Sequence, residues 1–256
     1  MFRSAPNPLL YEVGQLMVRK DFRQQGLAEH LTHTIINEFS TEIPIKVLFV
    51  EALCNHAISQ KLIEDNEFSA NCLEIEWLPT IKFDNAKVLD SNISLLLECR
   101  LYNDTPDEIF LHPAYTLFVS DRCRTLKAKR TIKIDIIPGS KMTESTINTI
   151  ADANIATLTV TQAGSDWPDI LAGFEAEVKT YRLHVKIDIS HPSAPWAIDI
   201  MRQNGFFLGG YLPLWFGGDG LLFQKLPKSP NFNLLHVYSD EGGSVLKAVQ
   251  ADYERT

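Results

Sequence analysis

Residues 11–28, close to the N-terminus, constrain the fold of this chain more than any other stretch. The segment from Tyr11 to Val18 predicts a β-strand, a turn that contains Gly26 follows, and residues 27–39 predict a helix. The first backbone N–H groups of such a helix have no intrahelical partner, and the helix dipole makes the potential there positive. Gly26 lets a ligand approach the backbone, and Arg23 adds a full positive charge. The turn therefore predicts a phosphate or pyrophosphate site.

The composition limits the classes of protein to which this chain can belong. With 256 residues, 45% of them apolar, it can build a substantial core in one large or two small domains. It has 24 Lys and Arg against 32 Asp and Glu, a net charge of −8, which argues against a partner made of nucleic acid or anionic lipid. Residues 1–8 lack the apolar core of a signal peptide, and no apolar run has bilayer length. We therefore expect a cytoplasmic protein with no membrane partner.

Neither the cysteines nor the histidines predict a metal site. The four cysteines are isolated and lack metal-ligand spacing, so we expect buried free thiols in a reducing compartment: Cys54, Cys72, Cys99 and Cys123. Glu29, His30 and His33 fall within one helical turn and could hold a metal ion. With only two imidazoles and no H-E-x-x-H pattern, a solvated helix face is the preferred interpretation, and we expect no metal.

Strand and helix patterns alternate along the chain, which predicts an α/β architecture. The predicted strands of the first half are 46–53, 70–78 and 94–101, with a helix over 55–64. In the second half the predicted elements are a strand at 183–189, a helix at 193–204, and strands at 205–213 and 221–226 joined by a hairpin turn at 217–220. Further elements are predicted between them, namely a strand at 108–111, a helix at 115–127 and strands at 131–137 and 156–160.

The second half repeats the first at an offset of roughly 138 residues, which places Phe68 on Phe206. We therefore expect two related units, residues 1–103 and 104–230, and a helical tail over residues 231–256. The chain has one basic cluster, Arg122, Arg124, Lys127, Lys129 and Arg130, which could meet an acidic partner or a phosphate group of a ligand. We expect this cluster to form a solvated helix face instead.

The residue pattern of the first turn resembles that of a known family. The pattern Arg23-x-x-Gly26-x-Ala28, preceded by Glu12-x-x-x-Leu16-x-Val18, resembles the acetyl-CoA pyrophosphate loop of the GNAT superfamily of N-acyltransferases. The resemblance covers residues 11–79 well and residues 183–226 more loosely. It implies an α/β (α+β) fold in which a mixed, mostly antiparallel sheet is flanked by helices.

The resemblance also implies a cofactor and a set of site residues. The cofactor would be acetyl-CoA or another acyl-CoA, the reaction would transfer its acyl group to an amine acceptor, and the protein could be a homodimer. The implied cofactor-binding residues are Leu16, Met17, Val18, Arg23, Gln24, Gln25, Gly26, Leu27, Ala28, Asn55 and Ser59. A backbone N–H near Met17 or Val18 would polarise the thioester carbonyl, with Glu12 and His56 as the catalytic candidates.

The match to the family is incomplete, so other interpretations stay open. The position of the family's tyrosine acid falls on Ile63, which cannot donate a proton. The ten residues before Tyr11 are too few for the family's N-terminal half, which is either absent or supplied by residues 100–155. The alternative function is a non-catalytic module that binds acyl-CoA or a partner, and a third hypothesis is an interaction module that has lost CoA binding.

Two further stretches carry residues that could form a site. The second unit has Thr161 to Asp166 where a phosphate loop would stand, without an arginine, and the Asp166 carboxylate would repel phosphate. We expect this turn not to bind CoA but to start a helix capped by Ser165 or Asp166. Cys54 and His56 could form a thiol–imidazole nucleophile, although a buried thiol and a capping histidine are the preferred interpretation.

Overall fold

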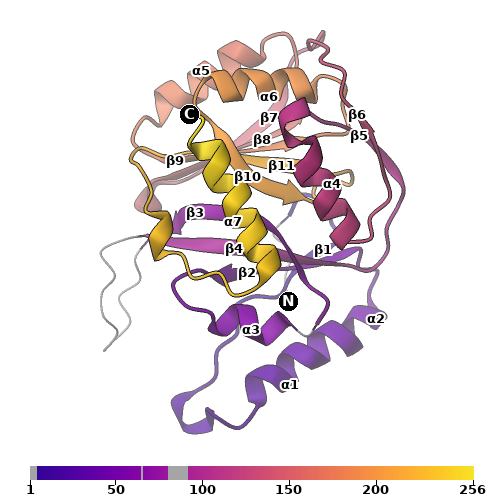
Figure 1. The fold of residues 1–256 in the computed structure, drawn as a ribbon, viewed down its shortest axis with the longest axis vertical. Helices are drawn as coiled ribbons and strands as arrows, with labels where there is room; N and C mark the ends of the chain where they lie inside the picture. Colours follow the sequence, from indigo (N-terminus) through magenta and orange to yellow (C-terminus); the bar gives the residue numbers. More distant parts are fainter. Residues whose placement is uncertain (1–4, 65, 80–91) are drawn as a thin grey trace.

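The computed structural model describes residues 5–64, 66–79 and 92–256, and a curled mixed sheet runs through it (Figure 1). The nine strands of this sheet, within the described residues, lie in the order β1-β2-β4-β3-β10-β11-β9-β8-β7. Their bounds are β1 Leu10–Glu12, β2 Val47–Leu53, β3 Ser69–Leu78, β4 Ile93–Leu101, β7 Glu144–Ile150, β8 Ile155–Gln162, β9 Arg182–Asp188, β10 Phe207–Leu212 and β11 Gly220–Lys225. A separate parallel pair consists of β5 Asp107–Phe110 and β6 Arg130–Lys133.

Helices flank the sheet and occupy both ends of the molecule. Their bounds are α1 Leu27–Thr34, α2 Ser40–Glu42, α3 Ile58–Glu64, α4 Thr116–Thr125, α5 Trp167–Glu177, α6 Ala194–Gln203 and α7 Asp240–Tyr253. A π-helical segment, Ile35–Phe39, joins α1 to α2. Helices α5 and α6 lie together at one end and α1 lies at the other, while α4 and α7 run next to each other in front of the sheet (Figure 1). The predicted mixed sheet flanked by helices is thus confirmed.

The connections between strands recur in the two halves of the sheet. The series β1-α1-β2-α3-β3-β4 produces the order β1-β2-β4-β3, and the series β8-α5-β9-α6-β10-β11 produces the order β8-β9-β11-β10. In each series the first two strands are parallel and the other pairings are antiparallel. The two series meet where β3 pairs with β10, in the register Gly210 opposite Cys72.

Some predicted elements differ from those observed. The strand predicted over residues 11–18 is wrong in length, because β1 ends at Glu12 and Val13 makes the last bond, its N–H donating to the Phe49 carbonyl at 2.9 Å. Beyond Phe49, β2 pairs only with β4, so the chain after Val13 has no strand beside it. The strand predicted to reach residue 137 ends at Lys133. Strand β7 was not predicted: it is an edge strand with every side chain exposed, so no buried face marks it.

Three groups of buried side chains hold the layers together. The largest lies around β8, β9, β10 and β11 with α5 and α6. In the second, Val245 and Val249 of α7 pack with Leu73 and Ile75 of β3 and with Phe207 of β10. Helix α7 therefore contacts both strands of the β3–β10 pair. The third surrounds Leu48 and Val50 beneath the helical run 27–42 and α3.

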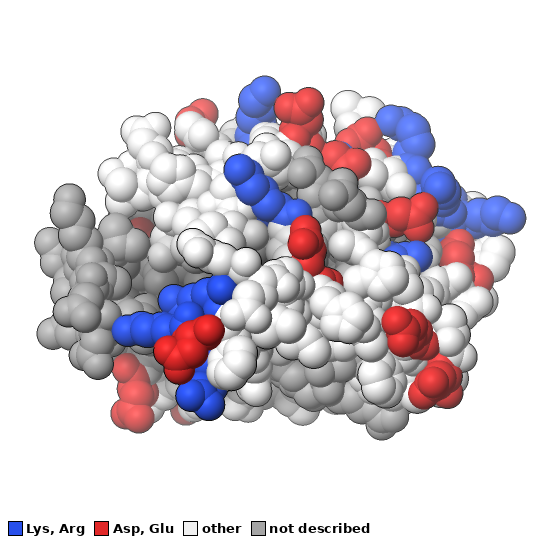
Figure 2. Space-filling model, turned by 90° about the horizontal axis from the view of Figure 1, so that it is seen from below, with Lys and Arg blue, Asp and Glu red and all other residues white. Residues whose placement is uncertain are grey.

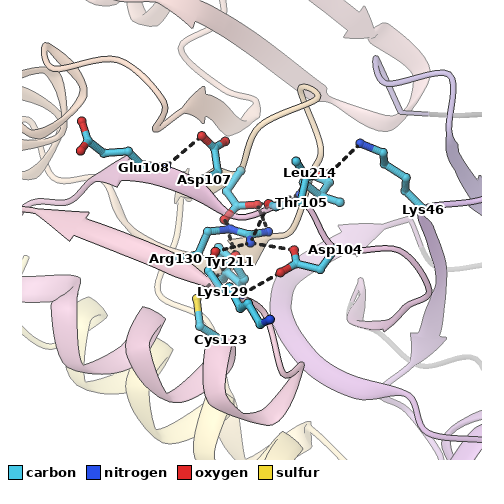
Figure 3. Close-up of polar contacts among 11 residues, drawn as sticks. Lys46, Asp104, Thr105, Asp107, Glu108, Cys123, Lys129, Arg130, Tyr211 and Leu214 are labelled. Atoms are coloured by element: carbon cyan, nitrogen blue, oxygen red, sulfur yellow. Dashed lines mark hydrogen bonds and ion pairs between the residues drawn. The ribbon is translucent and has the colours of Figure 1, made fainter.

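A buried ion-pair network joins the β5–β6 pair to the turn between β10 and β11 (Figure 3). The Arg130 guanidinium, 1% exposed, donates to the fully buried Asp219 carboxylate and to Asp104, the latter at 2.7 Å. Asp219 also accepts hydrogen bonds from the Tyr211 hydroxyl and, at 2.9 Å, from the Leu214 N–H. Burial opposes the charged form of Arg130, but Asp219 outweighs this and holds the pKa of Arg130 above its usual range.

Two members of the basic cluster are therefore not on a solvated face, and that prediction was wrong for them. Besides Arg130, the Arg122 side chain is only 3% exposed and donates to the Ala70 carbonyl at 2.9 Å while it pairs with Asp121. Arg124 matches the prediction, since it is 77% exposed. All four cysteines are free and buried, as predicted. No helix in the described ranges is both long and apolar enough to cross a membrane.

Candidate functional site

The turn before α1 has the backbone geometry of an open helix N-terminus. Gly26 is the N-cap residue and adopts φ +71°, in the left-handed region where glycine is favoured, and no side chain caps the helix. A Cβ built on Gly26 would meet no atom within 4 Å, so the space in front of the turn is free. The N–H groups of the first turn of α1 thus face an open approach, where an anion would satisfy them.

Arg23 is held at this turn by its own backbone neighbourhood. Its Nε donates to the Val18 carbonyl at 3.1 Å, which folds the side chain back across the segment that leaves β1. Lys20–Phe22 form a 3₁₀ turn in between, and Arg19 pairs with Asp21 at 3.3 Å on the surface. Arg23 is exposed, so the rest of its guanidinium can contact an anion.

An open pocket of about 950 Å³ lies between this turn and α3. Its lining residues are Leu16, Met17, Val18, Arg19, Lys20, Phe22, Arg23, Gln24, Gly26, Leu27, Ala28, Glu29, Ile58 and Leu62. Several apolar side chains are exposed here, above all Met17 at 86% and Ile58 at 74%. Figure 2 views this end of the molecule, and its surface is largely uncharged with small groups of both signs. The pocket therefore combines a polar turn with apolar walls, as a ligand with a charged and an apolar part requires.

Eight of the eleven predicted cofactor-binding residues are brought together here, and three are not. Eight of the nine predicted loop residues line the pocket, and the ninth, Gln25, donates from its side chain to the Asp21 carbonyl at 3.5 Å. The α3 wall is made by Ile58 and Leu62, whereas Asn55 and Ser59 do not line it. Asn55 instead lines a separate cavity of about 100 Å³ together with Cys54.

The two predicted catalytic residues lie in different surroundings. Glu12 ends β1, at the point where β1 and β2 part, and shares a sheet face with Phe49, its register partner. His56 lies at the start of α3, where its Nδ1 accepts the Ile58 N–H at 3.3 Å as a cap. Burial raises the pKa of the Cys54 thiol to about 12, which leaves it protonated and a poor nucleophile at neutral pH.

The corresponding turn before α5 is filled by the chain itself. Its N–H groups donate to residues 141–143: Gly164 to the Thr143 hydroxyl at 2.9 Å and Ser165 to the Lys141 carbonyl at 2.7 Å. Asp166 occupies the N-cap position, as predicted, but its carboxylate accepts the Thr143 N–H at 2.7 Å rather than capping α5. The N–H groups of Gly164 and Ser165 are thus taken by the chain itself, whereas no side chain caps α1. That this turn binds no CoA stays a prediction.

A polar cluster that the sequence analysis did not identify lies on the face of the sheet opposite α3 and α7. We call Glu12, Glu51, Glu74, His184 and Lys186 the Glu51 cluster. Leu73 packs with α7 and Val50 packs near α3, so the alternation of side chains turns Glu74 and Glu51 to the other face. Lys186 lies on the same face, because it is the register partner of Leu222, which pairs with Gly210, which in turn pairs with Cys72. Cys72 precedes Glu74 by two residues and therefore shares its face.

Burial and like charge dominate the electrostatics of this cluster. Burial, and next the Glu74 carboxylate, raise the pKa of Glu51 to about 8, although Lys186 opposes this. Burial also raises the pKa of Glu74, against the effect of the Lys186 ammonium 3.7 Å away. Burial and Lys186 hold the pKa of His184 well below its usual range, so its ring is neutral and its contact with Glu74 is not an ion pair.

The raised pKa of Glu51 predicts a measurable pH dependence of stability. The folded protein holds this proton up to about pH 8, whereas the unfolded chain releases it near 4.5, so stability is full below pH 4.5 and is lost as the pH rises toward 8. In Glu51→Gln this loss is absent. At about 1.4 kcal/mol per pH unit, we expect the variant to gain up to about 4 kcal/mol over wild type between pH 5 and pH 8 in urea denaturation. Glu144→Gln, on exposed β7, is the control, and parallel curves for wild type and Glu51→Gln would contradict the assignment.

No protein-family model matches this chain, and no curated protein or solved structure matches it.

Proposed function

We propose that this chain is an acyl-CoA-dependent N-acyltransferase of the GNAT type that transfers an acetyl or other acyl group to an amine. The observation that carries the proposal is the pocket before α1, where an uncapped helix N-terminus, Gly26 at φ +71° and the Arg23 guanidinium stand together. A pyrophosphate would accept hydrogen bonds from the first-turn N–H groups and from Arg23. The apolar walls, Met17 and Ile58 among them, would contact the pantetheine arm.

The parting of β1 from β2 supports the same proposal. The two strands are parallel and in register up to Glu12 and Phe49, and then the chain leaves the sheet toward Met17 and Val18. A thioester lying along this segment would present its carbonyl to backbone N–H groups, which stabilise the developing oxyanion. The amine nitrogen would bond to the carbonyl carbon while the C–S bond breaks. Glu12, the last paired residue of β1 where the two strands part, is our candidate for the proton acceptor.

The strand order gives independent support for two related GNAT-like units. In each half, two parallel strands are followed along the chain by two antiparallel strands. The later of these antiparallel strands lies beside the parallel pair in the sheet. Only the first half keeps an open turn, since residues 141–143 fill the turn before α5. We therefore expect one acyl-CoA per chain.

The test is calorimetric titration of acetyl-CoA into the wild-type chain and an Arg23→Glu, Gly26→Glu double variant. We expect one site with a Kd in the micromolar range, weakened at least tenfold in the variant, because two carboxylates would stand where phosphate binds. The matched control is Arg124→Glu, Gly173→Glu, which makes the same substitutions at an exposed arginine and at a helical glycine with no neighbour within 4 Å. Failure of the folded wild type to bind acetyl-CoA would overturn the proposal.

A non-catalytic acyl-CoA-binding module is the second candidate, and one observation favours it. Ile63, at the position of the family's tyrosine acid, is buried in the core beneath α1 and can neither donate a proton nor reach the pocket. Both candidates predict binding at the first turn, and turnover separates them. Release of free CoA in the presence of an amine panel, abolished by Glu12→Gln with acetyl-CoA binding retained, would support the enzyme.

A further inference from the structure

The outer edge of β7 is a row of backbone groups to which no strand is bonded. Strand β7 stands last in the order of the sheet, and among the described residues it pairs with β8 alone. On its other side, alternate residues of Glu144–Ile150 direct their N–H and C=O groups away from the sheet. The strand at the opposite end of the sheet, β1, has only 3 residues against the 7 of β7. An unpaired edge of this length is a template for a further strand.

The sequence of β7 does little to keep such a strand away. Edge strands that avoid pairing carry lysines, a proline or a bulge. From Glu144 to Ile150 the chain has no lysine and no proline, and its single charge, Glu144, stands at the first position. The one shift in register with β8 falls at that same end, between Glu144 and Ser145. The rest of the strand, rich in threonine and isoleucine, is regular and suited to pairing.

The edge also exposes apolar surface that continues the core. Ile147 and Ile150 are 49% and 48% exposed. Ile147 is the register partner of Leu158 in β8, whose side chain is fully buried in the largest core. Opposite residues of paired strands share a face, so Ile147 extends the apolar face of β8 beyond the last strand. A strand added to β7 would cover this surface and gain free energy from its burial.

Strand β7 fits a second copy of itself in antiparallel pairing. A twofold axis perpendicular to the sheet at Ile147 places this residue opposite its own copy and pairs the whole strand. The other opposite pairs are then Thr146 with Asn148, Ser145 with Thr149, and Glu144 with Ile150. Two isoleucines thus meet at the centre, and no two like charges stand opposite each other.

The charges that flank β7 complement each other in the same arrangement. Lys141 precedes the strand and Asp152 follows it, and both are exposed. Because the two strands run in opposite directions, the start of one lies at the end of the other. This brings Lys141 of each copy to the end where Asp152 of the other copy lies, so the flanks attract rather than repel.

We propose that β7 joins two copies of this chain by antiparallel pairing of their edges, so that the two sheets become one. The pairing is isologous and occupies β7 of both copies, so the assembly closes at two chains. The interface is small, and we expect a Kd in the micromolar range. The pocket before α1 lies beyond β1, at the opposite end of the sheet order, so pairing leaves it open.

Sedimentation velocity over a range of micromolar concentrations tests the pairing. We expect the wild type to sediment as a concentration-dependent mixture of one-chain and two-chain species. Ile147→Lys sets two ammonium groups opposite each other at the centre and is expected to weaken association at least tenfold. Leu117→Lys, which changes an 86% exposed leucine of α4, is the matched control and should associate like the wild type.

Three results would overturn the pairing. The first is a wild type that stays a single chain up to about 0.1 mM, which would leave the edge to a strand of another protein. The second is an Ile147→Lys variant that associates as tightly as the wild type. The third is a series of species larger than two chains, because an isologous contact cannot propagate.

A pair of double variants tests the register. In Thr146→Lys, Asn148→Glu each new lysine stands opposite a new glutamate of the other copy, and we expect association at least as tight as in the wild type. In Thr146→Lys, Asn148→Lys each new lysine stands opposite another lysine, and we expect association at least tenfold weaker. Equal association of the two folded variants would contradict the register centred on Ile147.

Hydrogen exchange places the contact on the strand. We expect alternate amides of β7 to gain protection at concentrations where two chains associate, and not to gain it in Ile147→Lys. Association without added protection in β7 would assign the contact to another surface and overturn the proposal. Titration of acetyl-CoA into Ile147→Lys is expected to match the wild type. Loss of acetyl-CoA binding with pairing intact would therefore overturn only the acyltransferase proposal.

Discussion

Asp219→Ala is expected to lower the free energy of unfolding by about 3–5 kcal/mol, because it leaves a buried cation without its main partner. Arg130 is 1% exposed, and two of its guanidinium nitrogens donate to Asp219. The same substitution strands the hydroxyl of the fully buried Tyr211 and the N–H of Leu214. Urea denaturation of the wild type and the variant, with a common slope, measures the difference.

Two comparisons make this result interpretable. Asp21→Ala removes an aspartate whose ion pair with Arg19 is 79% and 75% exposed, and we expect it to cost less than about 1 kcal/mol. Combining Asp219→Ala with Arg130→Met is expected to cost less than the sum of the two single changes, since both members of the fully buried Arg130–Asp219 pair are then removed together. If Asp219→Ala cost no more than Asp21→Ala, the network of Figure 3 would not stabilise the fold.

Gly210→Ala is the second change with a large expected effect, about 3–5 kcal/mol of destabilisation. A Cβ at this position would lie 2.3 Å from the Asn71 carbonyl oxygen and 2.3 Å from the Cys72 Cα, both in the backbone of β3. Backbone atoms cannot rotate away as a side chain does, so the strands must separate. Gly210 is also the residue through which β10 pairs with β3, so the damage falls on the junction of the two halves of the sheet.

The matched control is Gly173→Ala, in α5, where an added Cβ meets nothing within 4 Å. Replacing a helical glycine with alanine should be neutral or stabilise the protein by up to about 1 kcal/mol. Hydrogen exchange of the β3 and β10 amides adds a local measurement, and we expect their protection to fall in Gly210→Ala. Equal stability of the two variants would mean that the β3–β10 junction tolerates separation.

Elements with a strong local signal were predictable from the sequence. Strand β2 was predicted at residues 46–53 and is observed at Val47–Leu53, because a short run of apolar and β-branched residues favours a buried strand. The ends of strands were harder to predict. β1 stops at Glu12 because its neighbour turns to another partner, and this depends on β4, which lies far away in sequence.

The candidate sites also differ in whether their sequence signal is local. The turn around Gly26 was found because its residues are consecutive and its geometry is local. The Glu51 cluster was missed because its members come from four strands, with up to 174 positions between Glu12 and Lys186. A signal does exist in hindsight: Glu51, Glu74 and Lys186 each interrupt an apolar strand with a charge. Such a residue in a buried strand predicts a partner but not which one.

The junction of the two halves also bears on the order in which the protein can be made. Only Gly210 and Cys72 form a register pair between β3 and β10, and beyond it the Gln224 side chain takes over, bonding the Leu73 carbonyl and the Ile75 N–H at 2.9 Å each. Val245 and Val249 of α7 then cover this junction, yet α7 follows every strand in the sequence. During synthesis α7 therefore cannot cover the apolar face of β3 until it has left the ribosome, and in that interval this face is available to other apolar surfaces.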